Sequence, residues 1–296
     1  MKQAASDTSS TLTVSDEVLD GPHGCLTVRT FRAAAGTESG AGLVWAHGGA
    51  FAFGDLDMDE SDWLGRQLAI GGISVVSVDY QLAPWEPLSR LREMSPPKHP
   101  GSARYPIALE EMECAFQWAL STMPQLRWSL GGASAGANLA AGLAFQLRDH
   151  KDVLPASLVL AYGAFHPHAL RLRADLGTKL KSLSPASALT PEFIEAIALN
   201  YVDNANTLCV PYAFPGGHDA AGLPPTLVLN SDLDTLRPSG EAFAAGLAMA
   251  GVDVCQVCEP GSRHGHLSRD QPQAASRSIQ RIVRWMHSTT RKRRDS

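Results

Sequence analysis

Short apolar segments alternate with helical segments along this chain of 296 residues, and this alternation limits its fold more than any other feature. Residues 73–78 are β-branched and apolar, which predicts a buried strand, whereas residues 135–148 are rich in Ala and Leu, which predicts a helix. Strands separated by helices usually run parallel in one sheet, because each helix carries the chain back across a face of that sheet. The sequence therefore predicts an α/β fold with a mostly parallel central sheet flanked by helices.

The same patterns give the bounds of the other elements. Strands are predicted at residues 26–31, 42–46, 73–78, 127–130, 157–161, 225–230 and 252–257. Helices are predicted at residues 59–70, 105–122, 135–148, 189–201, 239–250 and 272–287. Thr190 and Pro191 are expected to be the N-cap and the first residue of the helix near 189–201. Residues 82–104, with five prolines, and residues 165–215 interrupt the alternation.

These interruptions suggest how the chain is divided. We expect residues 41–164 and 216–290 to form the α/β core, and residues 165–215 to form a small helical cap inserted over the sheet. Residues 1–40 are expected to contribute to the cap and to the first strands. Residues 291–296 are mostly basic, which is typical of a solvated tail.

The motif Gly132-Ala-Ser-Ala-Gly lies between a predicted strand and a predicted helix. A tight turn there projects Ser134 from the edge of the sheet, and Gly132 and Gly136 leave room where side chains would meet neighbouring backbone. The N-terminus of the following helix places partial positive charge near the oxyanion that forms in acyl transfer. Ser134 is therefore the candidate nucleophile, the alternative being an ordinary glycine-rich turn.

A second motif, His47-Gly-Gly-Ala-Phe, follows an earlier strand. Small residues let the backbone approach a substrate, so that amide groups rather than side chains point at its oxygen. The expected donors are the N–H groups of Gly49 and Ala50, and the N–H group of Ala135 completes the predicted oxyanion hole.

Together these motifs resemble those of the hormone-sensitive-lipase-like family of α/β-hydrolases, in its bacterial carboxylesterase branch. The resemblance extends from about residue 44 to residue 266 and rests on several motifs in one order. These motifs are His47-Gly-Gly-Ala-Phe-Ala-Phe-Gly-Asp, Val78-Asp-Tyr-Gln-Leu-Ala-Pro, Gly131-Gly-Ala-Ser-Ala-Gly-Ala-Asn-Leu-Ala, Ser231-Asp-Leu-Asp-Thr-Leu-Arg and His264-Gly-His. It implies a serine carboxylesterase that uses no metal or organic cofactor. Because the predicted cap is small and no long apolar tunnel can be read from the sequence, we expect short-to-medium-chain esters as substrates.

A serine nucleophile needs a base, and the base needs an acid to orient it. The resemblance assigns the base to His264, which follows the last predicted strand, with His266 as the main rival and His218 as a weaker one. The acid must follow the strand at residues 225–230, where Asp232 and Asp234 are both available. In the family the acid precedes a short element ending in Leu-Arg, which selects Asp234.

The chain departs from the family pattern at several positions. Ala50 stands where many members have a third glycine, and Ala133 replaces the acidic residue or threonine that often precedes the nucleophile. A proline-rich insertion follows Trp85, and Pro238 with Ser239 replaces acidic residues after Leu-Arg. None of these changes removes a triad member, but the first three alter the pocket walls.

Residues around the motifs are candidates for the substrate pocket, although core packing explains each of them equally well. These candidates are Phe51, Phe53, Trp85, Phe193 and Ile197. Asp79 and Tyr80 follow a strand end and are expected to hold the oxyanion loop in place.

Related functions stay open. A lactone is an intramolecular ester, and amide cleavage differs mainly in its leaving group, so a lactone hydrolase or an amidase would use the same triad. A non-catalytic ligand-binding protein of this fold is expected to lack a triad member, whereas this chain has a candidate for each.

Charge and hydropathy argue against several partners and locations. With 25 basic and 30 acidic residues the formal net charge is −5, so nothing favours binding to nucleic acid or to an anionic membrane. No apolar stretch reaches the ~20 residues that span a bilayer, and the N-terminus does not resemble a secretory signal, so a cytoplasmic location is expected. The expected partner is a small-molecule ester or lactone, and the oligomeric state, a homodimer included, stays open.

The five cysteines are scattered, which argues against a disulfide framework. Cys255 and Cys258 form a C-x-x-C pattern within a predicted strand, but the sequence has no second pair to complete a zinc site. We therefore expect no metal site there.

Overall fold

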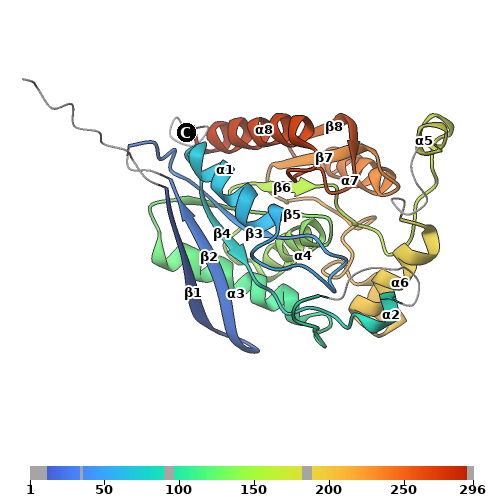
Figure 1. Cartoon of the computed structure of the whole chain (residues 1–296), viewed down its shortest axis with the longest axis horizontal. Coiled ribbons are helices and arrows are strands. Elements are labelled where there is room, and N and C mark those ends of the chain that lie inside the picture. The colour runs from blue at the N-terminus through green and yellow to red at the C-terminus, as the bar shows by residue number, and fades with distance from the viewer. Residues whose placement is uncertain (1–11, 34–35, 90–96, 182–188, 292–296) are drawn as a thin grey trace, which may run out of the picture.

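In this computed structural model, residues 12–33, 36–89, 97–181 and 189–291 are described, and they form an eight-stranded sheet with helices on both faces (Figure 1). The strand order is β1-β2-β4-β3-β5-β6-β7-β8; the pairs β1–β2 and β2–β4 are antiparallel and the other pairs are parallel. The strands are β1 (Thr13–Gly21), β2 (Gly24–Arg32), β3 (Ala41–Ala46), β4 (Ser74–Val78), β5 (Arg127–Ala133), β6 (Leu158–Ala161), β7 (Thr226–Leu233) and β8 (Val254–Arg263). The predicted mostly parallel sheet is confirmed.

Most helices lie close to the predicted positions, and three short helical segments within the described ranges were not predicted. A π-helical turn, η1 (Asp59–Trp63), runs into α1 (Leu64–Ile70), and α2 (Glu86–Ser89) is a single turn within the proline-rich stretch. The others are α3 (Ile107–Thr122), α4 (Ala135–His150), α5 (Ala174–Leu180), α6 (Pro191–Val202), the 3-10 helix η3 (Ala205–Cys209), α7 (Arg237–Met249) and α8 (Pro272–Arg291).

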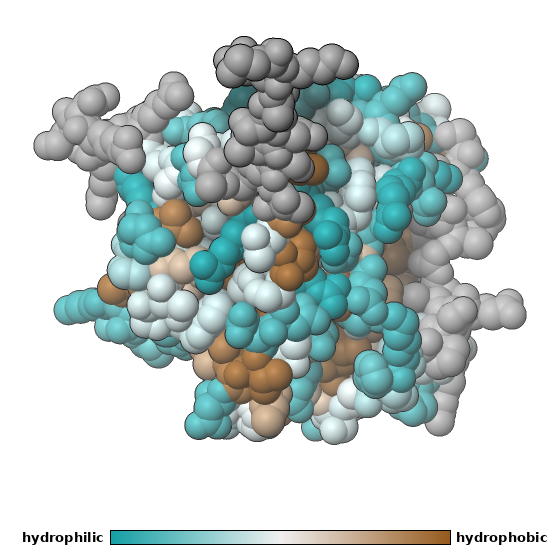
Figure 2. All heavy atoms as spheres, turned by 60° about the vertical axis from the view of Figure 1, so that its left-hand side comes forward, coloured by the Kyte–Doolittle hydropathy of each residue, from teal (hydrophilic) through white to brown (hydrophobic). Residues whose placement is uncertain are grey.

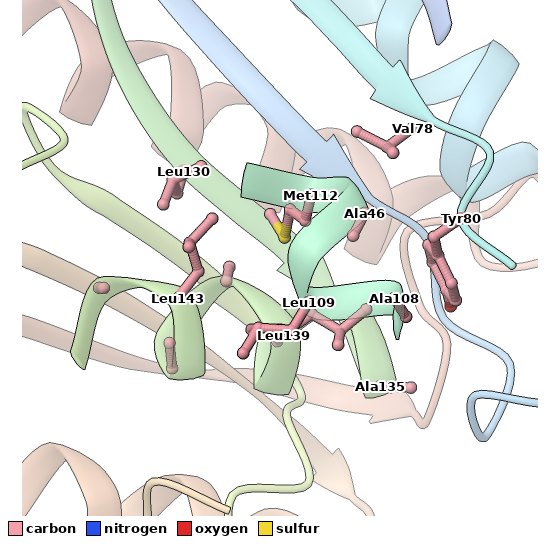
Figure 3. Packing of buried hydrophobic residues seen from close by; sticks show 14 of the residues in the cluster. Ala46, Val78, Tyr80, Ala108, Leu109, Met112, Leu130, Ala135, Leu139 and Leu143 are labelled. Carbon is pink, nitrogen blue, oxygen red and sulfur yellow. The ribbon is translucent and has the colours of Figure 1, made fainter. Parts of the chain in front are cut away.

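The central strands are buried on both faces, so their side chains alternate between two hydrophobic layers. In β3, Leu43 and Trp45 pack with α1 and α8, whereas Val44 and Ala46 pack with α3 and α4. On the second face, Leu130 of β5 lies over Leu143 of α4 (Figure 3). The continuous apolar character of these strands in the sequence follows from this double burial.

Strand β1 at the edge of the sheet was not predicted from the sequence. Its side chains are mostly exposed, and Leu19 is the single buried one. Polar residues on an edge strand discourage pairing with another chain, and they also remove the hydrophobic pattern by which a strand is recognised. The molecule seen from this side is mostly hydrophilic, with hydrophobic residues in small separate patches (Figure 2).

The two segments that interrupt the alternation of strands and helices, at residues 82–104 and 165–215, meet beside the carboxyl ends of the parallel strands. Thr190 caps α6 as predicted, its hydroxyl oxygen accepting a hydrogen bond from the Phe193 amide at 3.2 Å. The side-chain amide of Asn200 on α6 donates to the carbonyl of Pro84 at 2.8 Å, which fixes α6 to the proline-rich stretch. Some of the residues with predictions lie outside the described ranges: part of the proline-rich stretch (90–96), the N-terminal residues 1–11 and the tail at 292–296.

Among the helices of the described ranges, none combines the length and the apolar character that a membrane span needs.

Replacing Leu130 by alanine is expected to lower the free energy of unfolding by about 2–5 kcal/mol, because its side chain is fully buried where β5 meets α4. Val18→Ala on β1, where the side chain is 67% exposed, should change stability by less than ~0.5 kcal/mol. Urea unfolding measures both values. Equal losses of unfolding free energy in the two variants would contradict the assignment of the main core to the layer between β5 and α4.

Candidate active site

The carboxyl ends of the parallel strands bring four chain segments to one place. The loop after β3 begins at His47, Ser134 follows β5, Asp234 follows β7 and His264 follows β8. Parallel strands end at the same edge of a sheet, so residues far apart in the sequence meet there.

The turn that carries Ser134 is sharp. Ser134 has φ 53° and ψ −113°, and its amide donates to the carbonyl of Ala161 at 2.8 Å. A Cβ atom on Gly132 would lie 2.3 Å from the carbonyl carbon of Gly136, and one on Gly136 would lie 2.1 Å from the carbonyl oxygen of Ala46. Both glycines are therefore required by close backbone packing, as the sequence predicted.

Ser134, His264 and Asp234 form a hydrogen-bonded chain. The His264 Nε2 atom lies 3.0 Å from the Ser134 Oγ atom, and the His264 Nδ1 atom lies 2.7 Å from Asp234 Oδ2. Asp234 is 2% exposed, and its other oxygen accepts the amide of Leu236 at 2.9 Å. A carboxylate at Nδ1 favours the tautomer that carries its proton there, which leaves Nε2 free to accept from a serine hydroxyl.

The two rival histidines lie elsewhere. His266 is fully buried, and its ring nitrogens are 2.8 and 2.9 Å from the hydroxyl oxygens of Ser231 and Ser278. Burial lowers the pKa of His266 to about 3, which keeps this histidine neutral. His218 is not among the described residues that line the cavity at Ser134.

The rival acid is used in a different contact. One oxygen of Asp232 pairs with Arg237 at 2.7 Å and with Lys179 at 2.8 Å, and the other accepts the amide of Gly261 at 3.1 Å. The carboxylate of Asp232 is thus paired with Arg237 of α7 and Lys179 of α5, whereas the carboxyl group of Asp234 faces His264.

The loop after β3 turns tightly beside Ser134. Gly49, Ala50 and Phe51 have φ values of 124°, 51° and 59°, and a Cβ atom on Gly49 would lie 1.8 Å from the carbonyl oxygen of Phe53. The amides of Gly49, Ala50 and Ala135 find no hydrogen-bond partner among the described residues. All three residues line the cavity with Ser134, so these donors are available to an oxygen of a bound molecule.

Tyr80 holds the beginning of this loop, as expected. Its hydroxyl donates to the carbonyl of His47 at 2.9 Å, and its ring stacks on the His47 ring with centroids 4.4 Å apart. Asp79 differs, because it is exposed and its amide bonds to the carbonyl of Thr27 on β2.

A cavity of about 770 Å³ opens above Ser134. Of the predicted pocket residues, Phe51, Phe53, Phe193 and Ile197 line it. Trp85 does not line it and corrects the expectation, because its ring lies behind that of Phe53, edge-on at 5.9 Å between centroids. Further apolar lining comes from the segment at residues 189–214, through Leu189, Ile194, Ala198 and Phe214. The segment at residues 263–271 adds polar lining through Arg263, Ser268, Asp270 and Gln271.

Glu60 and Tyr162 were not among the site residues predicted from the sequence. Glu60 lines the cavity and is 7% exposed; one of its oxygens accepts the amide of Gly48 at 2.9 Å and the other accepts the Tyr162 hydroxyl at 2.7 Å. Burial raises the pKa of Glu60. A sequence signal existed, because Glu60 precedes the buried residues Leu64 and Leu68 at helical spacing, on the same face of the helix.

Comparisons with known proteins show the family and the fold of this chain. A family model described as alpha/beta hydrolase fold matches residues 43–93 and 97–268. The carboxylesterase NlhH of Mycobacterium tuberculosis is 30% identical over 237 residues, or 76% of this chain and 66% of NlhH, so this chain spans just under two thirds of that relative. The esterase LipI of the same organism is 30% identical over 253 residues, or 82% of this chain and 71% of LipI. A solved esterase structure from Pyrobaculum calidifontis has a TM-score of 0.77 at 27% identity and covers 93% of this chain and 85% of its own.

The buried histidine predicts how stability depends on pH. The pKa of His266 is lowered to about 3, below the ~6.5 of an unfolded histidine, so the unfolded chain takes up the proton first. The stability present above pH ~6.5 should thus be lost as the pH falls towards 3, by about 3–5 kcal/mol for this group. Burial lowers the pKa values of His47 and His166 to about 4, with the same sign.

Urea unfolding between pH 3 and 8 tests this expectation. The variant His266→Gln should lose less stability on acidification than the wild type, because it removes one of the three groups. Parallel pH curves for the two proteins would contradict the assignment of His266 as a buried neutral residue.

Proposed function

Since this chain belongs to the hormone-sensitive-lipase-like family of α/β-hydrolases, we propose that it is a serine carboxylesterase with Ser134 as nucleophile, His264 as base and Asp234 as the orienting acid. The observation that carries the proposal is the hydrogen-bonded chain from Asp234 through His264 to Ser134 at the floor of the cavity, with distances of 2.7 and 3.0 Å. The names of the relatives support the ester as substrate class, since NlhH is a carboxylesterase and LipI an esterase.

In the proposed first half of the reaction, the Ser134 hydroxyl attacks the ester carbonyl carbon while His264 takes its proton at Nε2. The negative charge of Asp234 stabilises the resulting imidazolium through the hydrogen bond at Nδ1. The carbonyl oxygen becomes an oxyanion and accepts hydrogen bonds from the amides of Gly49, Ala50 and Ala135. These donors are fixed in advance by the backbone, so the charge is stabilised without further reorganisation.

The tetrahedral intermediate then collapses. The bond to the alcohol oxygen breaks, and His264 donates its proton to the leaving alcohol, which leaves an acyl group on Ser134. Water enters next, gives a proton to His264 and attacks the acyl carbon, and the acid is released as Ser134 regains its hydroxyl.

In this proposal the core and the cap have different roles. The core at residues 41–164 and 216–290 supplies the triad and the amides. The cap at residues 165–215 supplies apolar walls through residues such as Phe193 and Ile197. A cavity of about 770 Å³ with such walls fits a short-to-medium acyl group better than a long chain.

Replacing Ser134 by alanine should lower hydrolysis of p-nitrophenyl esters by about a thousandfold or more, because the nucleophile is lost. Labelling by a fluorophosphonate probe should vanish with it. Ser268→Ala is the matched control, since Ser268 also lines the cavity.

A series of p-nitrophenyl esters from acetate to palmitate tests the chain length, and short-to-medium acyl groups should be turned over fastest. Labelling of Ser134 without turnover of any of these esters would redirect the search to lactones or amides. Full activity in Ser134→Ala would contradict the mechanism.

Paired substitutions test the base and the acid. Asp234→Asn should lower kcat/KM by about a hundredfold or more, because the amide side chain no longer fixes the tautomer of His264 or stabilises its charge. Asp232→Asn should keep kcat/KM within about tenfold and act mainly on stability, since Asp232 pairs with Arg237 and Lys179. Steady-state kinetics on both variants measures this difference, and a larger loss in Asp232→Asn would show that the acid was misassigned.

A further inference from the structure

Glu60 is a buried carboxyl group in the wall of the cavity, beside the proposed nucleophile. A Cβ atom on Gly48 would lie 2.6 Å from the Glu60 Oε2 atom and 3.2 Å from the Ser134 Cβ atom, so the carboxyl group and the nucleophile both border the same side of Gly48. The mechanism above does not use Glu60.

Burying a carboxyl group costs free energy, which only specific contacts offset. The side-chain partners of Glu60 are the Gly48 amide and the Tyr162 hydroxyl, and neither carries a positive charge. Packing alone would be satisfied by an apolar side chain of the same size. The contacts that retain an acid here are to Gly48, which lines the cavity, and to Tyr162, whose ring meets that of His264.

We propose that Glu60 is a positioning residue for the esterase reaction: its carboxyl group fixes the loop that carries the Gly49 and Ala50 amides and, through Tyr162, the ring of His264. This inference rests on the proposed function. It assigns Glu60 no contact with the reacting atoms.

The first half of this role concerns the oxyanion loop. Because Glu60 accepts the amide of Gly48 at 2.9 Å, the peptide before the two proposed donors has a fixed orientation. The next residue, Gly49, adopts φ 124°, and the turn closes as the amides of Ala52 and Phe53 donate to its carbonyl at 2.9 and 3.0 Å. Glu60 thus fixes one side of the loop and the turn fixes the other.

The second half concerns the base. The Tyr162 hydroxyl donates to Glu60 at 2.7 Å, and the same hydroxyl lies 3.4 Å from the Leu267 amide. The Tyr162 ring meets the His264 ring edge-on, with centroids 5.2 Å apart, and the His266 ring at 5.0 Å. Tyr162 itself has φ 38°, which is uncommon for a residue other than glycine. One carboxyl group therefore links the oxyanion loop with the segment at 264–267.

Three variants and a control test the role. In Glu60→Ala both hydrogen bonds are lost, and kcat should fall about 10–100-fold while KM changes less than about threefold, because misplaced catalytic groups act mainly on the chemical step. Glu60→Gln should recover most of kcat, since its amide oxygen can accept from Gly48 and its amide nitrogen can donate to the Tyr162 oxygen. Tyr162→Phe should fall between them. Asp59→Asn, which changes the neighbouring carboxylate that pairs with Arg269 outside the cavity, should resemble the wild type.

Rates are referred to active sites titrated with the fluorophosphonate, so that loss of folded protein does not count as loss of kcat. A Glu60→Ala variant with wild-type kcat per titrated site would overturn the proposal, whatever its stability, and so would a Glu60→Gln variant as slow as Glu60→Ala. If Glu60→Ala fails to fold, Tyr162→Phe decides, and a kcat within twofold of wild type overturns the proposal. A folded wild type that is neither labelled nor active would overturn the esterase function itself, a result distinct from each of these.

Discussion

The sharp turn between β5 and α4 is the constraint on which the rest of the structure depends. It holds Ser134 at φ 53°, and it requires backbone contacts so close that neither Gly132 nor Gly136 has room for a Cβ atom. Such a conformation persists only where the surrounding structure fixes it, and here buried parallel strands and α4 do so. The same turn ends at the N-terminus of α4, so one local feature supplies both the proposed nucleophile and one proposed oxyanion donor.

Around this turn, buried polar groups are used in two different ways. Asp234 and Glu60 are carboxyl groups that hydrogen-bond residues lining the cavity. His266, in contrast, is neutral and buried, and its hydrogen bonds to Ser231 and Ser278 connect the segment after β8 with β7 and α8. Removing water from these groups strengthens each hydrogen bond and makes each unpaired group costly. We infer that the site is held rigid by such contacts, while the cap side of the cavity is formed mainly by apolar side chains.

The sheet and most helices could be predicted from the sequence because strands buried on both faces are continuously apolar. The two loops at the site could be recognised because their glycines stand where backbone segments approach closely. Strand β1 escaped prediction because an edge strand needs no hydrophobic pattern, and Trp85 was misplaced because an aromatic residue near a motif packs behind the wall as readily as on it. The choice of Asp234 over Asp232 and of His264 over His266 came from family resemblance, since two residues of one type at a spacing of two differ only in where their side chains point. Glu60 was missed because it lies in an acidic run that resembles a solvated helix face.

The most direct measurement of the central claim is a crystal structure of the protein after reaction with a small organophosphate, with the modified peptide identified by mass spectrometry. The account predicts one adduct, on the Ser134 Oγ atom, with a phosphoryl oxygen within hydrogen-bond distance of the Gly49, Ala50 and Ala135 amides. It also predicts that His264 stays hydrogen-bonded to Asp234. An adduct on another residue, or one on Ser134 whose phosphoryl oxygen points away from these amides, would contradict it.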